Sequence, residues 1–158
     1  MLEEVVELAG PLAQNKSLDL RLETKITDQL DLEADRIRLR QVMINLVNNA
    51  IKFTEAGSVT VNAVRNDGHL LVIVHDTGVG IPANHLETIF QEFHQVDSST
   101  TRKAGGTGLG LPISCHLIEL HNGRLWAESD GRSGLEGGST FLVELPIQSD
   151  YHPDAKRR

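Results

Sequence analysis

The pattern of hydrophobic and polar positions along the chain predicts helices and strands in an irregular order. Apolar residues recur at helical spacing in four segments, residues 2–13, 36–53, 85–93 and 109–121. Alternating or continuous apolar runs predict five strands, at residues 18–22, 59–64, 70–74, 124–128 and 140–145. This order is typical of a two-layer α/β sandwich, in which helices cover one face of a mixed, mostly antiparallel sheet.

Three local signals refine this picture. Asp35 stands where the N-cap of the helix at 36–53 belongs, and Asn66-Asp67-Gly68 is a good hairpin turn between two strands. Residues 94–106 are polar and show no periodicity. A segment of that length without a pattern inside a compact domain is usually functional.

Composition narrows the class of protein. The chain has 158 residues, a formal net charge of −7 and a single cysteine, Cys115. The acidic balance disfavours a nucleic-acid-binding surface, and the lone cysteine excludes an internal disulfide and suits a reducing compartment. No run of about 18 apolar residues is present, so we expect a cytoplasmic domain without direct membrane contact.

The helix at 36–53 carries an unusual polar stripe. Asn45, Asn48, Asn49 and Lys52 fall within an arc of roughly 100° at 100° per residue. The stripe could simply be solvated, but asparagine is a poor helix former, and Glu, Lys or Arg would be more usual there. Amide oxygens are suitable ligands for Mg²⁺ when phosphates supply the remaining ones, and a lysine one turn later could contact the same phosphates.

Asp76 follows the buried strand run and precedes Gly78 and Gly80. An Asp-Thr-Gly turn is common, and taken alone the segment would be interpreted as purely structural. The functional reading places the carboxylate in a pocket, where it accepts a hydrogen bond from an amine such as that of adenine. Glycines would then let the backbone approach the ring.

A third candidate is the glycine-rich segment 105–112. It lacks the Gly-Lys-Ser/Thr of a Walker loop, and a polar loop rather than a strand precedes it, which also excludes a dinucleotide fingerprint. Pro112 is compatible with the first turn of a helix, so the segment would present backbone N–H groups to an anion. Arg102 and Lys103 lie just before it. The alternative is a flexible linker, which does not explain several glycines and a threonine at the start of a helix.

Taken in order, these segments resemble the ATP-binding catalytic domain of sensor histidine kinases. The wider superfamily includes DNA gyrase, heat-shock chaperones and mismatch-repair ATPases. The resemblance covers roughly residues 15–147 and rests on five boxes. These are the asparagine box at 45–54, the first glycine box at 76–82, the phenylalanine box at 89–93, the second glycine box at 106–111 and the Gly-Ser-Thr-Phe stretch at 138–141.

The resemblance implies a Bergerat-type fold with Mg-ATP bound beneath a lid at residues 94–106. The residues implied to contact ATP are Asn49, Lys52, Phe53, Asp76, Gly78, Gly80, Ile81, Arg102, Lys103, Gly106, Thr107, Gly108, Leu109, Gly110 and Thr140.

Individual roles also follow from the resemblance. Asn49, with Asn45 nearby, would hold Mg²⁺, and Lys52 would meet the phosphates. Asp76 would accept the adenine amine with the assistance of Thr140. These implied roles make Asn45, Asn49 and Lys52 the catalytic set.

Two departures from the family pattern shape the expected activity. Hydrolytic members hold a water-activating glutamate four positions before the Mg²⁺-binding asparagine, whereas this chain has Asn45, which cannot take a proton. No histidine lies in the surroundings typical of the phosphoacceptor. We therefore expect residues 1–14 to be the remnant of a link to a histidine-bearing dimerisation domain, residues 15–148 to be the catalytic domain and residues 149–158 to be a flexible tail.

The expected function is transfer of the γ-phosphoryl group of ATP to that histidine, with a response-regulator receiver domain downstream. Three alternatives remain open from sequence. They are a serine kinase of the anti-sigma-factor type, a gyrase-type hydrolase and a nucleotide-binding or docking module without catalysis.

Overall fold

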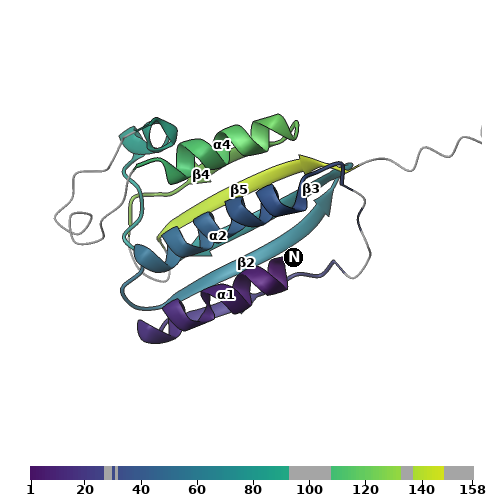
Figure 1. Ribbon diagram of the computed structural model, residues 1–158. Helices are drawn as coiled ribbons and strands as arrows, with labels where there is room; N and C mark the ends of the chain where they lie inside the picture. Colours follow the sequence, from purple (N-terminus) through teal and green to yellow (C-terminus); the bar gives the residue numbers. More distant parts are fainter. Residues whose placement is uncertain (27–29, 31, 93–107, 133–136, 148–158) are drawn as a thin grey trace, which may run out of the picture.

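The computed structural model describes residues 1–26, 30, 32–92, 108–132 and 137–147, and shows one layer of helices over one sheet (Figure 1). The helices are α1 (Leu2–Asn15), α2 (Arg36–Lys52) and α4 (Gly110–Leu120), with single 3-10 turns η1 (Ala83–His85) and η2 (Thr88–Phe90). The strands are β1 (Asp19–Leu22), β2 (Ser58–Asn66), β3 (His69–Asp76), β4 (Arg124–Glu128) and β5 (Ser139–Pro146).

The five strands form one sheet in the order β1-β2-β3-β5-β4. β1 pairs with β2 in parallel, and the other three pairs are antiparallel. Alternate residues of the central strands are buried, as expected when helices cover one face of a sheet. They include Val59, Val61, Val72, Val74, Phe141 and Val143. The predicted α/β sandwich is therefore confirmed.

The turn between β2 and β3 also follows the prediction. Asn66 pairs with His69, and the two residues between them, Asp67 and Gly68, have φ values of 42° and 79°. Positive φ at both central positions is the geometry of the tight hairpin turn that matches the twist of the strands.

α2 is the central helix of the covering layer, and its N-terminal end is fixed by side chains. Asp35 Oδ1 accepts hydrogen bonds from the Ile37 and Arg38 amides at 2.9 and 3.1 Å, which confirms the predicted N-cap. The Asp35 amide in turn donates to Nε2 of His121 at the end of α4, at 3.0 Å. The start of α2 is thus tied to the end of α4.

The opposite end of α2 is held from α1. Lys16 Nζ donates to the carbonyl oxygens of Ile51, Lys52 and Thr54 at 2.8, 3.0 and 2.7 Å. A cation at the C-terminal end of a helix complements the carbonyls that have no partner inside the helix. α1 also buries Val5, Ala9 and Ala13 in the core shared with α2. The link from residues 1–14 to another domain stays a prediction.

The helix predicted at 85–93 is wrong for the described part of that range. Residues 83–85 and 88–90 each form one 3-10 turn, and residue 93 lies outside the described residues. Of these turns only Ile89 is buried. A short segment with so little apolar burial gains too little from packing to offset helix nucleation.

No helix among the described residues combines the length and apolar character needed to cross a bilayer.

Candidate functional site

The candidate site lies where the C-terminal end of α2 meets the turn that follows β3. The Val79 amide donates to the Phe53 carbonyl at 3.2 Å, so the turn packs directly on the C-cap of α2. A side chain at position 78 would collide with that same carbonyl, which explains the requirement for Gly78. The predicted asparagine box and first glycine box are therefore in contact.

Asp76 occupies the last position of β3 and is 2% exposed. Its Oδ1 accepts hydrogen bonds from the Gly78 amide at 2.9 Å and the Ser139 amide at 3.3 Å. Both hydrogen bonds are accepted by Oδ1, so neither of them involves Oδ2. Burial raises the pKa of the Asp76 carboxyl above its ordinary value, against the opposing effect of the two amides and of His75.

The rest of the first glycine box is held by the loop after β4. Gly80 has φ 72°, and a side chain there would meet the Arg132 carbonyl oxygen at 2.6 Å. Ile81 is buried, and its amide donates to Ser129 Oγ at 2.9 Å. The predicted pocket residues Asp76, Gly78, Gly80 and Ile81 thus form one ordered turn.

The predicted catalytic residues are half-buried on α2. Asn45, Asn49 and Lys52 are spaced four and three residues apart, which places them on one face of the helix. Lys52 Nζ lies 5.2 Å from the centroid of the Phe53 ring. Lys52 and Phe53 therefore stand at the end of α2 that contacts the Asp76 turn.

Asn45 connects α2 to α4. Its Nδ2 donates to Oγ of the buried Ser114 at 3.0 Å. A side chain at position 110 would meet Asn45 Oδ1 at 2.5 Å, so glycine lets the first residue of α4 lie directly against this amide. Asn45 and the start of α4 are thereby brought together.

The start of α4 presents backbone amides that have no partner within the helix. Leu109 is the N-cap residue without a side-chain hydrogen bond, and Gly108 precedes it with φ 71°. The first bond of the helix runs from the Ile113 amide to the Leu109 carbonyl. The amides of Gly110 and Leu111 precede this bond, as expected for a helix terminus that can receive an anion. The other predicted lid and glycine-box residues, Arg102, Lys103, Gly106 and Thr107, lie outside the described residues.

Thr140, which the resemblance implies to assist Asp76, is not brought to the Asp76 carboxylate. Its Oγ1 lies 2.9 Å from His75 Nδ1, and the two residues are paired across β3 and β5. Neighbouring residues of a strand point to opposite faces of the sheet, so His75 and Thr140 face away from Asp76 and Ser139. Ser139, which pairs with Asp76, is the β5 residue at the site.

Sequence reasoning missed three serines that support the site. Ser139 donates its amide to Asp76, Ser114 accepts from Asn45, and Ser129 accepts from Ile81. Their short polar side chains carry no spacing signal, because each partner is distant in sequence. Only Ser139 could have been indicated, because it is the second residue of the Gly-Ser-Thr-Phe stretch at 138–141.

The side chains on this face of α2 fit a divalent cation bound together with phosphates. Because Asn45 uses Nδ2 toward Ser114, its Oδ1 points away from that bond. Asn49 supplies a second amide on the same face. Neutral oxygens in small number suit Mg²⁺, which retains waters and takes further oxygens from phosphates.

Comparison with known proteins places the chain in a family. The family model described as "Histidine kinase-, DNA gyrase B-, and HSP90-like ATPase" matches residues 34–149. The autoinducer 2 sensor kinase/phosphatase LuxQ of Vibrio cholerae is 40% identical over 152 residues, which are 94% of this chain and 17% of LuxQ. The chain therefore spans less than a fifth of that relative.

Solved structures show the same arrangement of elements. The catalytic domain of histidine kinase ThkA aligns with a TM-score of 0.76 at 34% identity, over 91% of this chain and 90% of that domain. Full-length ShkA in complex with AMPPNP aligns with a TM-score of 0.79 at 34% identity, over 92% of this chain and 29% of ShkA. ThkA is also known in complex with the response regulator protein TrrA, with a TM-score of 0.73 at 32% identity, over 92% of this chain and 39% of that chain.

Proposed function

The chain belongs to the family of histidine kinase-, DNA gyrase B- and HSP90-like ATPases, and we propose that it binds Mg-ATP and transfers the γ-phosphoryl group to a histidine on a separate dimerisation domain. Support comes from the likeness to histidine kinase catalytic domains and to a kinase structure that holds AMPPNP. The reaction would require the chain to bind the base, neutralise the phosphates and align the γ-phosphoryl group.

The base would be read by Asp76. Its Oδ1 is engaged by two amides, which fixes the carboxyl plane and directs Oδ2 as an acceptor for an exocyclic amine. Gly78 permits the surrounding backbone to come close, and Phe53 stands on the α2 side of the same turn. A buried acceptor of this kind selects a base with an amine over one without it.

The phosphates would lie between α2 and the start of α4. Lys52 supplies a positive charge, and the amides of Gly110 and Leu111 supply hydrogen-bond donors. Asn49 and Asn45 would hold Mg²⁺, which when bound neutralises phosphate charge. These residues would account for anion binding by a chain whose net charge is −7.

The observation that favours phosphoryl transfer over hydrolysis is that position 45 holds an amide side chain and that this amide is hydrogen-bonded. Its amide donates to Ser114, and an amide cannot accept a proton from water. Transfer to a neutral imidazole needs little beyond positioning and charge neutralisation, since the acceptor nitrogen is itself the nucleophile.

The acceptor histidine would be carried by a dimerisation domain, and a response-regulator receiver would take the phosphoryl group from it. The complex of ThkA with a response regulator supports the second partner. The predicted boundaries at residues 14 and 148, and the cytoplasmic location, are part of the same proposal.

The proposal is tested by incubating the chain with Mg-ATP labelled at the γ-phosphate and a histidine-bearing helical hairpin domain. We expect label on the hairpin that is lost in acid and retained in base, as is usual for a phosphorylated imidazole. The same hairpin with its histidine replaced by alanine is the matched control.

Other outcomes would redirect the assignment. Acid-stable label on a serine would identify a serine kinase, and steady ATP turnover without any acceptor would identify a hydrolase. Nucleotide binding without transfer to several hairpin partners would contradict the kinase proposal.

A further inference from the structure

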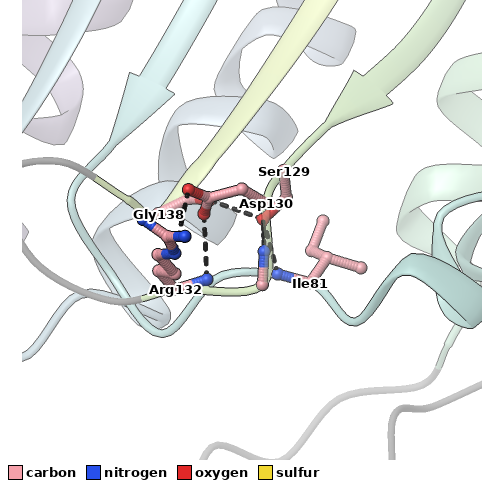
Figure 2. Close-up of polar contacts among 6 residues, drawn as sticks. Ile81, Ser129, Asp130, Arg132 and Gly138 are labelled. Atoms are coloured by element: carbon pink, nitrogen blue, oxygen red, sulfur yellow. Dashed lines mark hydrogen bonds and ion pairs between the residues drawn. The ribbon is translucent and has the colours of Figure 1, made fainter.

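The hydroxyl of Ser129, in the loop after β4, joins two segments that are distant in sequence (Figure 2). Ser129 Oγ accepts a hydrogen bond from the Ile81 amide at 2.9 Å and donates to the Gly138 carbonyl at 2.6 Å. It also accepts from the Gly131 amide in its own turn at 3.2 Å. A hydroxyl has one proton to donate and two lone pairs that can accept, so these three bonds use its full capacity.

The two distant partners of Ser129 stand on either side of Asp76. Ile81 ends the turn whose Gly78 amide donates to Asp76 Oδ1, and Gly138 directly precedes Ser139, whose amide donates to the same oxygen. A side chain at position 138 would collide with the Asp76 carbonyl, so this segment lies directly against the end of β3. Ser129 therefore holds both backbone segments that set the orientation of the Asp76 carboxylate.

The turn that carries Ser129 is itself braced. Asp130 Oδ1 accepts from the Arg132 amide at 2.9 Å, and Asp130 Oδ2 lies 3.8 Å from the Arg132 guanidinium (Figure 2). The Arg132 carbonyl accepts from the Gly138 amide at 2.7 Å. Gly138 is thus held through both its amide and its carbonyl, which limits how far Ser139 can move relative to Asp76.

From these contacts we propose that Ser129 is a positioning residue for nucleobase recognition, which acts by holding the two amide donors that orient Asp76. The inference rests on the proposed function, because it takes Asp76 to be the group that reads the base amine. Ser129 does not contact the base in this scheme. Its loss would let Oδ2 of Asp76 leave the direction in which it accepts the amine.

The consequence is a loss of discrimination, distinct from a general loss of affinity. Inosine triphosphate carries a carbonyl where ATP carries the exocyclic amine, so it offers Asp76 no amine donor at that position. If Ser129 positions Asp76, the substitution Ser129→Ala weakens ATP binding and changes inosine triphosphate binding much less. If Ser129 only supports the fold, both nucleotides lose affinity together.

The test is isothermal titration of the chain with ATP and with inosine triphosphate, for the wild type and for Ser129→Ala. We expect the ratio of the two affinities to fall by about tenfold in the variant, the size of one lost hydrogen bond. Thr24→Val is the matched control. The Thr24 hydroxyl, in a loop after β1 outside the Asp76 turn, donates to the Ala63 carbonyl and accepts from the Ile26 amide. Its ratio should equal that of the wild type.

The outcomes separate this inference from the proposed function. A wild-type chain that does not prefer ATP over inosine triphosphate overturns the proposed role of Asp76, and the inference with it. A wild-type preference that Ser129→Ala retains overturns the inference alone. Should Ser129→Ala unfold at the temperature of the titration, Ser129→Cys keeps the shape of the side chain with a slightly larger and more weakly hydrogen-bonding group, and the same change in the affinity ratio is the test.

Discussion

The carboxamide of Asn45 on α2 donates a 3.0 Å hydrogen bond to the hydroxyl of Ser114 on α4. The bond joins the helix that carries Asn49 and Lys52 to the helix that begins with the amides of Gly110 and Leu111. Its geometry depends on glycine at position 110, where a side chain would lie 2.5 Å from Asn45 Oδ1. The distance between the two helices is therefore set by three residues that no local pattern connects.

This contact predicts energetic coupling between positions 110 and 45. We expect Gly110→Ala to destabilise the wild type, because the new methyl group displaces Asn45 from Ser114. In an Asn45→Ala background the same substitution should be milder by about 1 kcal/mol, the usual range for residues in contact. Urea denaturation of the four chains measures this difference, and additive effects would show that the contact carries no energy.

Asp76→Asn should separate stability from nucleotide binding. Burial raises the pKa of Asp76 above its ordinary value of 3.8, so the folded chain holds the proton more tightly than the unfolded chain. Stability from this group is then fully present below pH 3.8 and is lost as pH rises through the raised pKa. Asparagine stays neutral and still offers Oδ1 to the Gly78 and Ser139 amides.

The measurement is the melting temperature of both chains across pH, together with ATP titration near pH 7. We expect the advantage of Asp76→Asn to grow as pH rises through the raised pKa, while its ATP affinity falls by about tenfold or more. Glu3→Gln, at an exposed position of α1, is the control for removal of a carboxylate. Unchanged ATP affinity in Asp76→Asn would mean that the base pocket lies elsewhere.

Lys16→Met should lower stability by releasing the C-terminal end of α2. The variant keeps most of the aliphatic stem and removes three hydrogen bonds to carbonyl oxygens of Ile51, Lys52 and Thr54. Because the ammonium is partly solvated, we expect a loss of about 1–2 kcal/mol in the free energy of unfolding. Lys25→Met, at an exposed position, removes the same charge and should change stability little, and equal losses in the two variants would argue against the cap.

Asn49→Ala should reduce phosphoryl transfer while the fold persists. We expect a fall of about 100-fold in the rate of labelling of the hairpin partner, the effect of losing one strong electrostatic contact in the transition state. ATP binding in the presence of EDTA should change much less, since the amide is assigned to Mg²⁺. Gln41→Ala, exposed on the same helix, is the control, and a transfer rate in Asn49→Ala equal to that control would remove Asn49 from the catalytic set.

What the sequence predicted correctly is what neighbouring residues determine. The Asp35 cap and the Asp67-Gly68 turn follow from local hydrogen bonding and backbone preferences, and both are confirmed. The helix at 85–93 failed because periodicity alone does not report how much apolar surface the rest of the fold offers to a segment.

The site residues show the same difference between local and tertiary determinants. The order of boxes indicated Asp76 and α2, but the choice between Ser139 and Thr140 depends on which face of β5 each occupies. That choice is set by the pairing of Ser139 with Asp76 across 63 positions of sequence. The contacts of Ser114 and Ser129 are likewise tertiary, and a single sequence has no period or spacing that reveals them.

The anchoring of α2 has a thermodynamic consequence for binding. Asp35 and His121 hold its beginning, Ser114 holds its middle and Lys16 holds its end. The backbone that carries Asn49 and Lys52 is thus fixed when the chain folds. A nucleotide would therefore bind to a preorganised surface on the α2 side of the site. The conformational entropy lost on binding would then arise mainly in the segments that face α2, so affinity should be most sensitive to changes in those segments.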